Sequence, residues 1–427
     1  MANSKVKNTP AKSLDDSMVT FIAEGFRTFV ARQVLSEMKK RRTRLAPSDR
    51  ELILKAIVAG ESDSRLKIPR RAKEALEAVL QDLHLEPLFE KYNVAMDREL
   101  PGIVANTALK MAPGILKTLK ATWPERETEH RQLMEGFYFR LERTWKVPFS
   151  KLSMLVACAI EVGEGVNLRF RNLDAPETPN LINVLTRLHA RSCQVAQEIL
   201  VLLKHGYSEG AMARWRTLHE IVVTMNFIYE HGESSADRYT QHDAVETYRA
   251  ACQFQQNCGK LNYEPLTSLE IEISKIAYDR AITTFGRSFG GQYGWAAIDL
   301  KSSRPTFAEI ERAVEMDHYR SHFKFASHNV HANPKGIFFK MGLHGPTDIL
   351  MCGPSNLGLA EPGQNTALSL SVATATVIQI GPTMEDIFAC GTITRMVKEI
   401  SAAFVDTERK VVARTERQQR KEGKLNA

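Results

Sequence analysis

Apolar residues recur along most of the chain at the three- and four-residue spacing that places side chains on one face of a helix. Near the N-terminus this spacing is carried by Phe21, Ile22, Phe26, Phe29 and Val30. A helix with one apolar face buries that face against a neighbour, so a series of such helices forms a bundle. The pattern predicts a mostly α-helical protein, a helical bundle preceded by an N-terminal helical region.

Polar and proline-containing stretches divide the predicted helices into regions. We expect a disordered N-terminus over residues 1–16, an N-terminal helical region over 17–170, a larger helical domain over 181–405 and a basic tail over 406–427. The segment 171–179 contains two prolines and is typical of a link between helical regions. A chain of 427 residues is long enough for two domains.

Within the larger domain, two long helices are predicted between residues 181 and 229, joined at His205-Gly206-Tyr207. Gly206 suits the end of a helix, where a positive φ is needed. Further single helices are predicted over 306–332 and 364–405. Only the segment 337–352 resembles strands: two short apolar runs flank a turn that contains glycine and proline, which predicts a small β-hairpin.

Composition narrows the class of protein. Hydrophobic residues make up 43% of the chain and charged residues 25%, as in ordinary globular proteins. The six cysteines are scattered and form no C-x-x-C pair, which fits a reducing compartment. The N-terminus lacks the apolar core of a signal peptide, and no apolar run approaches the length of a membrane span. We therefore expect a cytoplasmic protein with no membrane partner. No phosphate-binding or dinucleotide glycine motif is present, so no cofactor is expected.

The net charge of +7 is concentrated in two places. One block contains Lys39, Lys40, Arg41, Arg42 and Arg44, and basic residues also cluster between 409 and 424. Such clusters favour a polyanionic partner, so the five residues of the block are candidate contacts to RNA or DNA. A solvated helix face and a disordered tail would give the same pattern.

The first candidate site lies on the second of the two long helices. Arg216 and Glu220 are four positions apart, on one face, and His219 is next to Glu220. The surrounding positions are apolar nearly all round, which indicates that these polar side chains are at least half buried and need partners. A structural ion pair explains the arrangement; so does an arginine held ready for an anionic group, with Glu220 orienting it or acting as acid and base.

The same helix carries a short motif. Arg214 and His219 have the R-x4-H spacing used by the HEPN class of ribonucleases, and Arg312 and His318 have the R-x5-H variant. A chain with 12 histidines matches such spacings often by chance, so the pattern by itself is weak.

The second candidate site lies in the segment 318–331. His318 and His322 have the spacing of metal ligands on a helix, but no carboxylate stands between them. Ser327 and His331 are also four apart, on a nearly opposite face, so a single four-histidine metal site is not expected. His331 in the last turn fits a histidine held by helix carbonyls. Alternatively, Ser327 and His331 face Arg216 and Glu220 across a cleft, and His331 or His219 acts as a base. A further alternative is that Ser327 is a nucleophile with His331 as its base, but the sequence contains no oxyanion motif.

Taken in order, these residues resemble a bacterial family catalogued only as a domain of unknown function. The resemblance rests on Gly206-Tyr207, Ala211, Arg216, Leu218 and Glu220, followed by Tyr293-Gly294-Trp295, Tyr319, Ser327 and His331. It covers about 187–385. It implies a mostly α-helical fold without an agreed activity, and functional positions at Arg216, Glu220, Ser327 and His331. The additional histidines around Ser327 depart from the family pattern and cast doubt on a mechanism with one histidine.

Two functions are consistent with the sequence. The first is a nucleic-acid-directed protein, in the form of a metal-independent ribonuclease of defence or toxin type, in which Arg216 stabilises the phosphorane charge, Glu220 holds Arg216, and His331 or His219 is the general base. The second is a non-catalytic binding or regulatory module in which the Arg–Glu pair is structural. A homodimer is left open.

Overall fold

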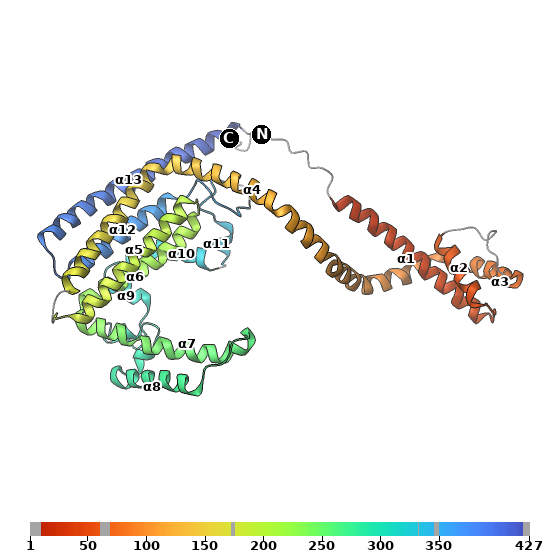
Figure 1. Cartoon of the computed structure of the whole chain (residues 1–427), viewed down its shortest axis with the longest axis horizontal. Helices are drawn as coiled ribbons and strands as arrows, with labels where there is room; N and C mark the ends of the chain where they lie inside the picture. The colour runs from red at the N-terminus through yellow and green to blue at the C-terminus, as the bar shows by residue number, and fades with distance from the viewer. Residues whose placement is uncertain (1–9, 60–68, 172–175, 332, 346–349, 422–427) are drawn as a thin grey trace. The chain divides into compact units, whose positions relative to one another are not determined.

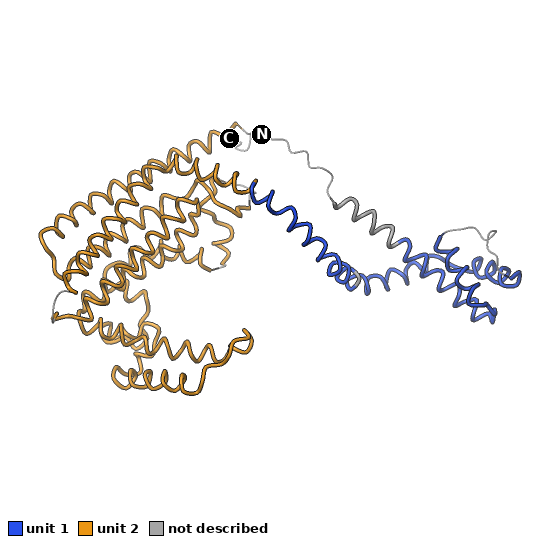
Figure 2. Tube along the Cα trace, viewed as in Figure 1, with its two compact units in different colours: residues 1–128 blue, residues 129–427 orange. Residues whose placement is uncertain are grey.

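The computed structural model describes residues 10–59, 69–171, 176–331, 333–345 and 350–421, without the side chains of residues 10–22 and 103. The described chain is mostly α-helical, with short 3-10 turns, and these residues include no strand (Figure 1). The chain divides into two compact units, residues 1–128 and 129–427 (Figure 2).

Unit 1 is a small helical cluster. It contains α1 (Pro10–Lys40), α2 (Pro47–Ala59), α3 (Arg70–Gln81) and the first part of α4 (Leu85–Arg171). A compact apolar core joins α1, α2 and α3, formed by Val30, Val34, Met38, Ile53, Leu76 and Val79. Of the residues that predicted an apolar face near the N-terminus, Val30 is buried in this core, Phe26 packs against it and Phe29 is half-buried, whereas the side chains of Phe21 and Ile22 lie outside the description.

Unit 2 is a helical bundle built on α5 and α6. Its helices are the rest of α4, α5 (Pro179–Lys204), α6 (Ser208–Gln241), α7 (Asp243–Asn257), α8 (Ser268–Phe285), α9 (Phe307–Ala313), α10 (Arg320–Val330), α11 (Pro334–Phe338), α12 (Ala360–Ile378) and α13 (Met384–Lys421). The 3-10 turns are η2 (Cys258–Leu261), η3 (Arg287–Gly290), η4 (Gly294–Ala296) and η5 (Asp317–Tyr319). α5 and α6 pack along each other, and α12 packs against both (Figure 1). One continuous core, including Trp145, Trp215 and Phe404, holds these helices together.

The predicted joint between the two long helices is present. Gly206 adopts φ +79° between α5 and α6, and its carbonyl oxygen accepts a hydrogen bond of 2.9 Å from the backbone N–H of Ser355. A Cβ at this position would lie 2.7 Å from the Ser355 carbonyl oxygen. Both the conformation and the space therefore require glycine here.

The single helix predicted over 306–332 is wrong. α9 ends at Ala313, η5 follows, and α10 begins only at Arg320; Glu315 between them has φ +54°. The single helix predicted over 364–405 is also two helices, α12 and α13. Here Thr383 caps α13: its hydroxyl accepts from the Asp386 N–H at 3.3 Å, and Asp386 accepts from the Thr383 N–H at 2.9 Å.

The predicted β-hairpin is not supported. Its first strand, expected over 337–341, overlaps α11, because Asn333 caps a new helix by accepting from the Gly336 N–H at 2.9 Å and Pro334 fits its first position. Residues 348–349 of the second strand lie outside the described residues, and residues 350–352 form no strand.

The boundaries of the compact units fall elsewhere than the composition suggests. The division between residues 128 and 129 lies inside α4, whereas the expected linker at 171–179 separates α4 from α5 within unit 2. Of the N-terminal stretch 1–16, residues 1–9 lie outside the described residues and α1 begins at Pro10. α13 continues through the expected basic tail as far as Lys421. None of the described helices is long and apolar enough to cross a membrane.

Candidate functional site

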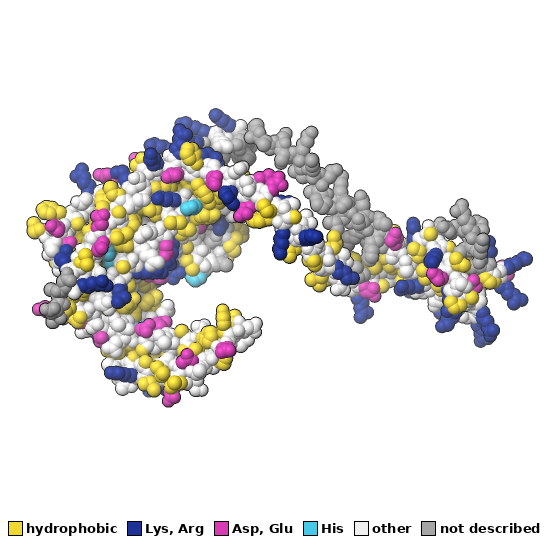
Figure 3. Space-filling model, in the orientation of Figure 1, with side chains coloured by type: hydrophobic (Ala, Val, Ile, Leu, Met, Phe, Trp, Pro, Cys, Tyr) yellow, Lys and Arg dark blue, Asp and Glu magenta, His cyan; other side chains and the backbone are white. Residues whose placement is uncertain are grey.

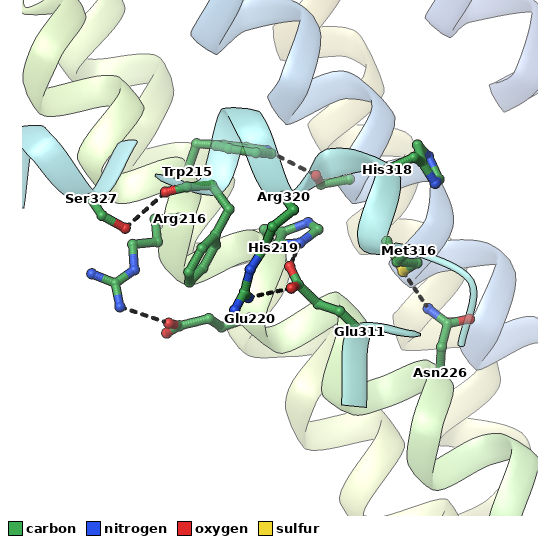
Figure 4. A network of polar contacts seen from close by, with 12 residues as sticks. Trp215, Arg216, His219, Glu220, Asn226, Glu311, Met316, His318, Arg320 and Ser327 are labelled. Atoms are coloured by element: carbon green, nitrogen blue, oxygen red, sulfur yellow. Dashed lines mark hydrogen bonds and ion pairs between the residues drawn. The ribbon is translucent and has the colours of Figure 1, made fainter. Parts of the chain in front are cut away.

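A buried carboxylate, Glu311, joins three helices of unit 2. Its Oε1 lies 2.9 Å from His219 Nε2 on α6, and its Oε2 accepts a short hydrogen bond from the Arg320 guanidinium on α10 (Figure 4). On an unbroken helix, Glu311 and Arg320 would stand roughly 13 Å apart along the axis. The break between α9 and α10 is therefore what brings the two charges together.

His219 is enclosed by aromatic rings. Its imidazole is 1% exposed, and its ring centroid lies 5.3 Å from Trp215, 5.7 Å from Phe323 and 5.8 Å from Tyr319. The second ring nitrogen, Nδ1, is buried and has no hydrogen-bond partner among the residues that the structure describes. An enclosed imidazole of this kind cannot exchange protons with a solvent-borne substrate unless the aromatic wall opens.

Arg216 and Glu220 form the expected pair at the edge of this cluster. Arg216 Nη2 lies 3.2 Å from Glu220 Oε1, and the Arg216 guanidinium stacks over the Phe323 ring at 4.7 Å (Figure 4). The two charged side chains are 25% and 36% exposed. The pair is thus half-buried, as the apolar surroundings predicted, and its guanidinium is supported by an aromatic face.

A cavity of about 820 Å³ opens beside Glu220. Its wall includes Tyr239, Tyr293, Trp295 and Phe307. Burial, followed by the negative charge of Glu220, raises the pKa of Tyr293. The phenol is accordingly neutral at physiological pH and serves the cavity as a hydrogen-bonding group, and not as a base.

Ser327 and His331 lie farther along α10. The Ser327 hydroxyl donates to the Phe323 carbonyl oxygen at 2.8 Å, one helical turn back. His331 is the exposed residue that ends α10. No hydrogen bond or ion pair among the described residues joins either side chain to Arg216 or Glu220, so their convergence on one cleft stays a prediction.

The remaining arginine and histidine motifs take separate partners. Arg214 makes a short hydrogen bond to Glu198 on α5, and five positions on a helix turn it roughly 140° away from His219. His318 Nδ1 lies 3.0 Å from the Glu315 carbonyl oxygen, whereas His322 Nδ1 lies 2.8 Å from Glu361. In the part of the chain that the structure describes, no three His, Cys, Asp or Glu side chains group as a metal site would require.

The basic block of unit 1 lies at the end of α1. Lys39, Lys40, Arg41, Arg42 and Arg44 are all exposed. Two of them are partly neutralised, since Lys40 pairs with Glu37 at 2.5 Å and Arg41 with Asp82 at 2.7 Å. The other three make no ion pair with a described residue and retain their full charge toward solvent.

A second basic surface lies in a groove between α4 and α13, inside unit 2. The groove encloses about 1090 Å³. Its charged lining residues are Arg140, Arg143, Lys151, Glu399, Asp406, Lys410 and Arg414. Lys151 is neutralised by Glu399 at 2.5 Å. Arg140, Arg143, Lys410 and Arg414 form no ion pair within the described residues, so the groove carries an excess of positive charge.

Sequence reasoning missed Glu311, Arg320 as its partner, and the groove. Arg140 and Arg143 are three apart, and Lys410 and Arg414 are four apart, so each pair shares a helix face. Such pairs are common on solvated helices, and only the packing of α4 beside α13 joins them. Glu311 has no local signal at all, because its partners come from two other helices.

Residues 182–347 match the model of a family of unknown function, DUF5677. The resemblance expected from the Gly206–Glu220 motif is thereby confirmed over less than half of the chain, and Arg216, Glu220, Ser327 and His331 all fall inside the matched segment. No curated protein and no solved structure matches the chain.

Proposed function

We propose that the protein binds nucleic acid and that the groove between α4 and α13 is its principal contact surface. The observation that carries the proposal is a set of four cations along one groove, Arg140, Arg143, Lys410 and Arg414, none of which forms an ion pair with a described residue. A channel lined by one sign of charge concentrates a polyanion, and guanidinium groups match phosphate oxygens in geometry. The exposed block 39–44 of unit 1 adds a second contact of the same kind.

The lining of the groove favours a single strand as the ligand. Phe137, which also packs against the core, lines the groove together with the cations, and we propose that the part of its ring left exposed stacks on an unpaired base. In this proposal the Arg216–Glu220 pair and the Glu311 cluster hold the matched domain together, which is the role of a binding module. The enclosure of His219 supports binding over cleavage, because the nearest histidine to Arg216 is shielded from solvent.

The test is a comparison of two fourfold variants in a binding titration with single-stranded RNA and DNA. One variant changes Arg140, Arg143, Lys410 and Arg414 to Gln. The control changes the exposed Lys146, Lys204, Lys260 and Lys398 to Gln, which removes the same charge from outside the groove.

Four lost phosphate contacts should lower the slope of log K against log salt by roughly three. We expect this loss in the groove variant alone. Equal weakening of both variants would show that only net charge matters, and unchanged binding by the groove variant would refute the proposal.

Cleavage of RNA is a second candidate, supported by a specific feature of Arg216. Its side chain is 25% exposed, and the guanidinium is held by Glu220 and Phe323. Among the described residues only its Nη2 makes a hydrogen bond, so the exposed part of the guanidinium has donor capacity left for a phosphate oxygen in a transition state. His331, which is exposed, would have to supply the base from the end of α10.

A further inference from the structure

One stretch of α4 in unit 1 presents a row of large apolar side chains to solvent. Leu109, Met111, Ile115, Leu116, Leu119 and Trp123 are each between 48% and 72% exposed. Space around this stretch is open, since a Cβ added to Gly102 or Gly114 would meet no atom within 4 Å. Soluble proteins rarely leave a contiguous apolar surface of this kind uncovered, so it marks an interaction site.

The charge on the same stretch has a single sign. Residues 101–124 contain Lys110, Lys117 and Lys120 but no Asp or Glu. At 100° per residue, the six apolar side chains fall within an arc of about 160° and the lysines occupy about 80° of the remainder. Hydrophobic and basic side chains are visible together along this part of α4 in Figure 3.

We propose that residues 101–124 form an amphipathic helix that binds the surface of an anionic lipid bilayer. Three features hold a helix in the plane of a membrane interface: apolar side chains on one side, lysines as the only charged residues on the other, and a tryptophan among the apolar residues. Long lysine side chains at the edge of the apolar arc reach outward to anionic headgroups. The helix lies on the bilayer and does not cross it.

Charge argues against a second copy of the chain as the occupant. A two-helix seam uses a narrow stripe of apolar positions flanked by charges of both signs, whereas this arc is wide and the only charged residues beside it are lysines. Two copies joined through this face would bring like charges together. A bilayer with anionic lipids satisfies both the apolar arc and the lysines, which departs from the sequence-based expectation of no membrane partner.

The fluorescence of Trp123 reports directly on contact between this helix and a bilayer. The chain has four tryptophans, and Trp145, Trp215 and Trp295 are buried, whereas Trp123 is 58% exposed. Phosphatidylcholine vesicles containing phosphatidylglycerol should shift the emission of the full chain to shorter wavelength and protect it from acrylamide quenching. Vesicles of phosphatidylcholine alone should do so much less. Trp123→Phe should remove the shift without removing binding.

Matched variants distinguish binding through the apolar face of residues 101–124 from nonspecific hydrophobic binding to vesicles. Changing Leu109, Leu116 and Leu119 to Gln should weaken partitioning into anionic vesicles by at least about tenfold. The control changes Leu269, Ile273 and Ile276 of α8 to Gln, three side chains of similar exposure in unit 2, and should bind as wild type. Changing Lys110, Lys117 and Lys120 to Gln should abolish the preference for anionic over neutral vesicles.

The outcomes are decisive because all of the changed side chains are exposed and the fold is checked by circular dichroism. Loss of vesicle binding in the α4 leucine variant but not in the α8 variant supports the proposal. Equal loss in both, no vesicle binding by the wild type, or a wild-type dimer that the α4 leucine variant converts to monomer without any lipid effect would overturn it. Binding of RNA by the leucine variant should be unchanged, which keeps this test separate from that of the groove.

Discussion

His219 Nε2 and Glu311 Oε1 lie 2.9 Å apart, and both side chains are almost completely buried. One comes from the middle of α6 and the other from the short helix α9, so the contact links segments 92 positions apart in sequence. Because each group has lost its hydration, each depends on the other and on Arg320 for compensation. If the cluster stabilises unit 2, removing one of its members should therefore lower the free energy of unfolding.

Glu311→Ala should therefore destabilise unit 2 strongly. The change leaves the guanidinium of Arg320 and the imidazole of His219 without their carboxylate, and breaking a buried pair costs about 3–5 kcal/mol. Urea unfolding followed by circular dichroism measures the loss. Glu272→Ala, which removes an exposed carboxylate from α8, is the control and should change the stability by less than about 0.5 kcal/mol. Similar values for the two variants would show that Glu311 contributes no compensated charge.

The two arginines of α6 separate the second candidate function from scaffolding. Arg216→Gln should lower any RNA cleavage by roughly 10²–10³, the usual effect of removing one transition-state donor. Arg214→Gln is the matched control, since Arg214 is also partly exposed and also paired with a glutamate. It should leave cleavage intact. If no cleavage is detected in the wild type, or if both variants lose it equally, Arg216 is not a catalytic residue.

His331→Ala supplies the complementary measurement. His331 is exposed at the end of α10, so its removal should change the free energy of unfolding by less than about 0.5 kcal/mol. A general base contributes typically 10²–10⁴ to a rate, so a ribonuclease that uses His331 would lose about that factor. Full cleavage by the variant would remove His331 from the proposed mechanism.

Gly206→Ala should destabilise the joint between α5 and α6. The positive φ costs an alanine roughly 1–2 kcal/mol, and the close Ser355 carbonyl adds to this. Gly210→Ala is the matched control only four positions away. Its added methyl group meets no atom closer than 3.5 Å, and alanine is the better helix former by about 0.5–1 kcal/mol. Thermal unfolding should move in opposite directions for the two variants.

The buried His189 should make stability depend on pH. Burial lowers its pKa from 6.5 to about 4, so the unfolded chain binds a proton between these values and the folded chain does not. Its contribution is therefore complete above pH 6.5 and is lost as the pH falls toward 4, in total roughly 3 kcal/mol. His189→Gln should flatten this part of the pH profile.

Two features of the structure could be predicted from neighbouring residues in the sequence. Gly206 required a positive φ, and the half-burial of Arg216 and Glu220 followed from the apolar residues around them on α6. The break between α9 and α10 could not be predicted in the same way. Residues 314–319 contain neither glycine nor proline, so no residue of this segment signals the positive φ that Glu315 adopts after α9.

The apparent hairpin shows the opposite problem, in which a local pattern was present but ambiguous. The apolar run 337–341 suits a strand, yet Asn333 and Pro334 start a short helix whose last two residues, Ile337 and Phe338, are the first two of that run. The capping residue and the proline determine the local structure here, because an apolar run of this length does not distinguish a strand from a helix. Glu311 could not be predicted as part of the candidate site, because its partners, His219 on α6 and Arg320 on α10, approach it only in the folded protein.

The three-way contact at Glu311 also constrains how this part of the sequence varies among relatives. A chain that loses the carboxylate alone leaves the histidine and the arginine without their partner. A chain that replaces all three positions with apolar residues of similar volume has no charge left to compensate. His219, Glu311 and Arg320 are therefore expected to be inherited and exchanged as a triplet, with few intermediates. An alignment in which Glu311 changes freely while His219 and Arg320 remain would contradict this linkage.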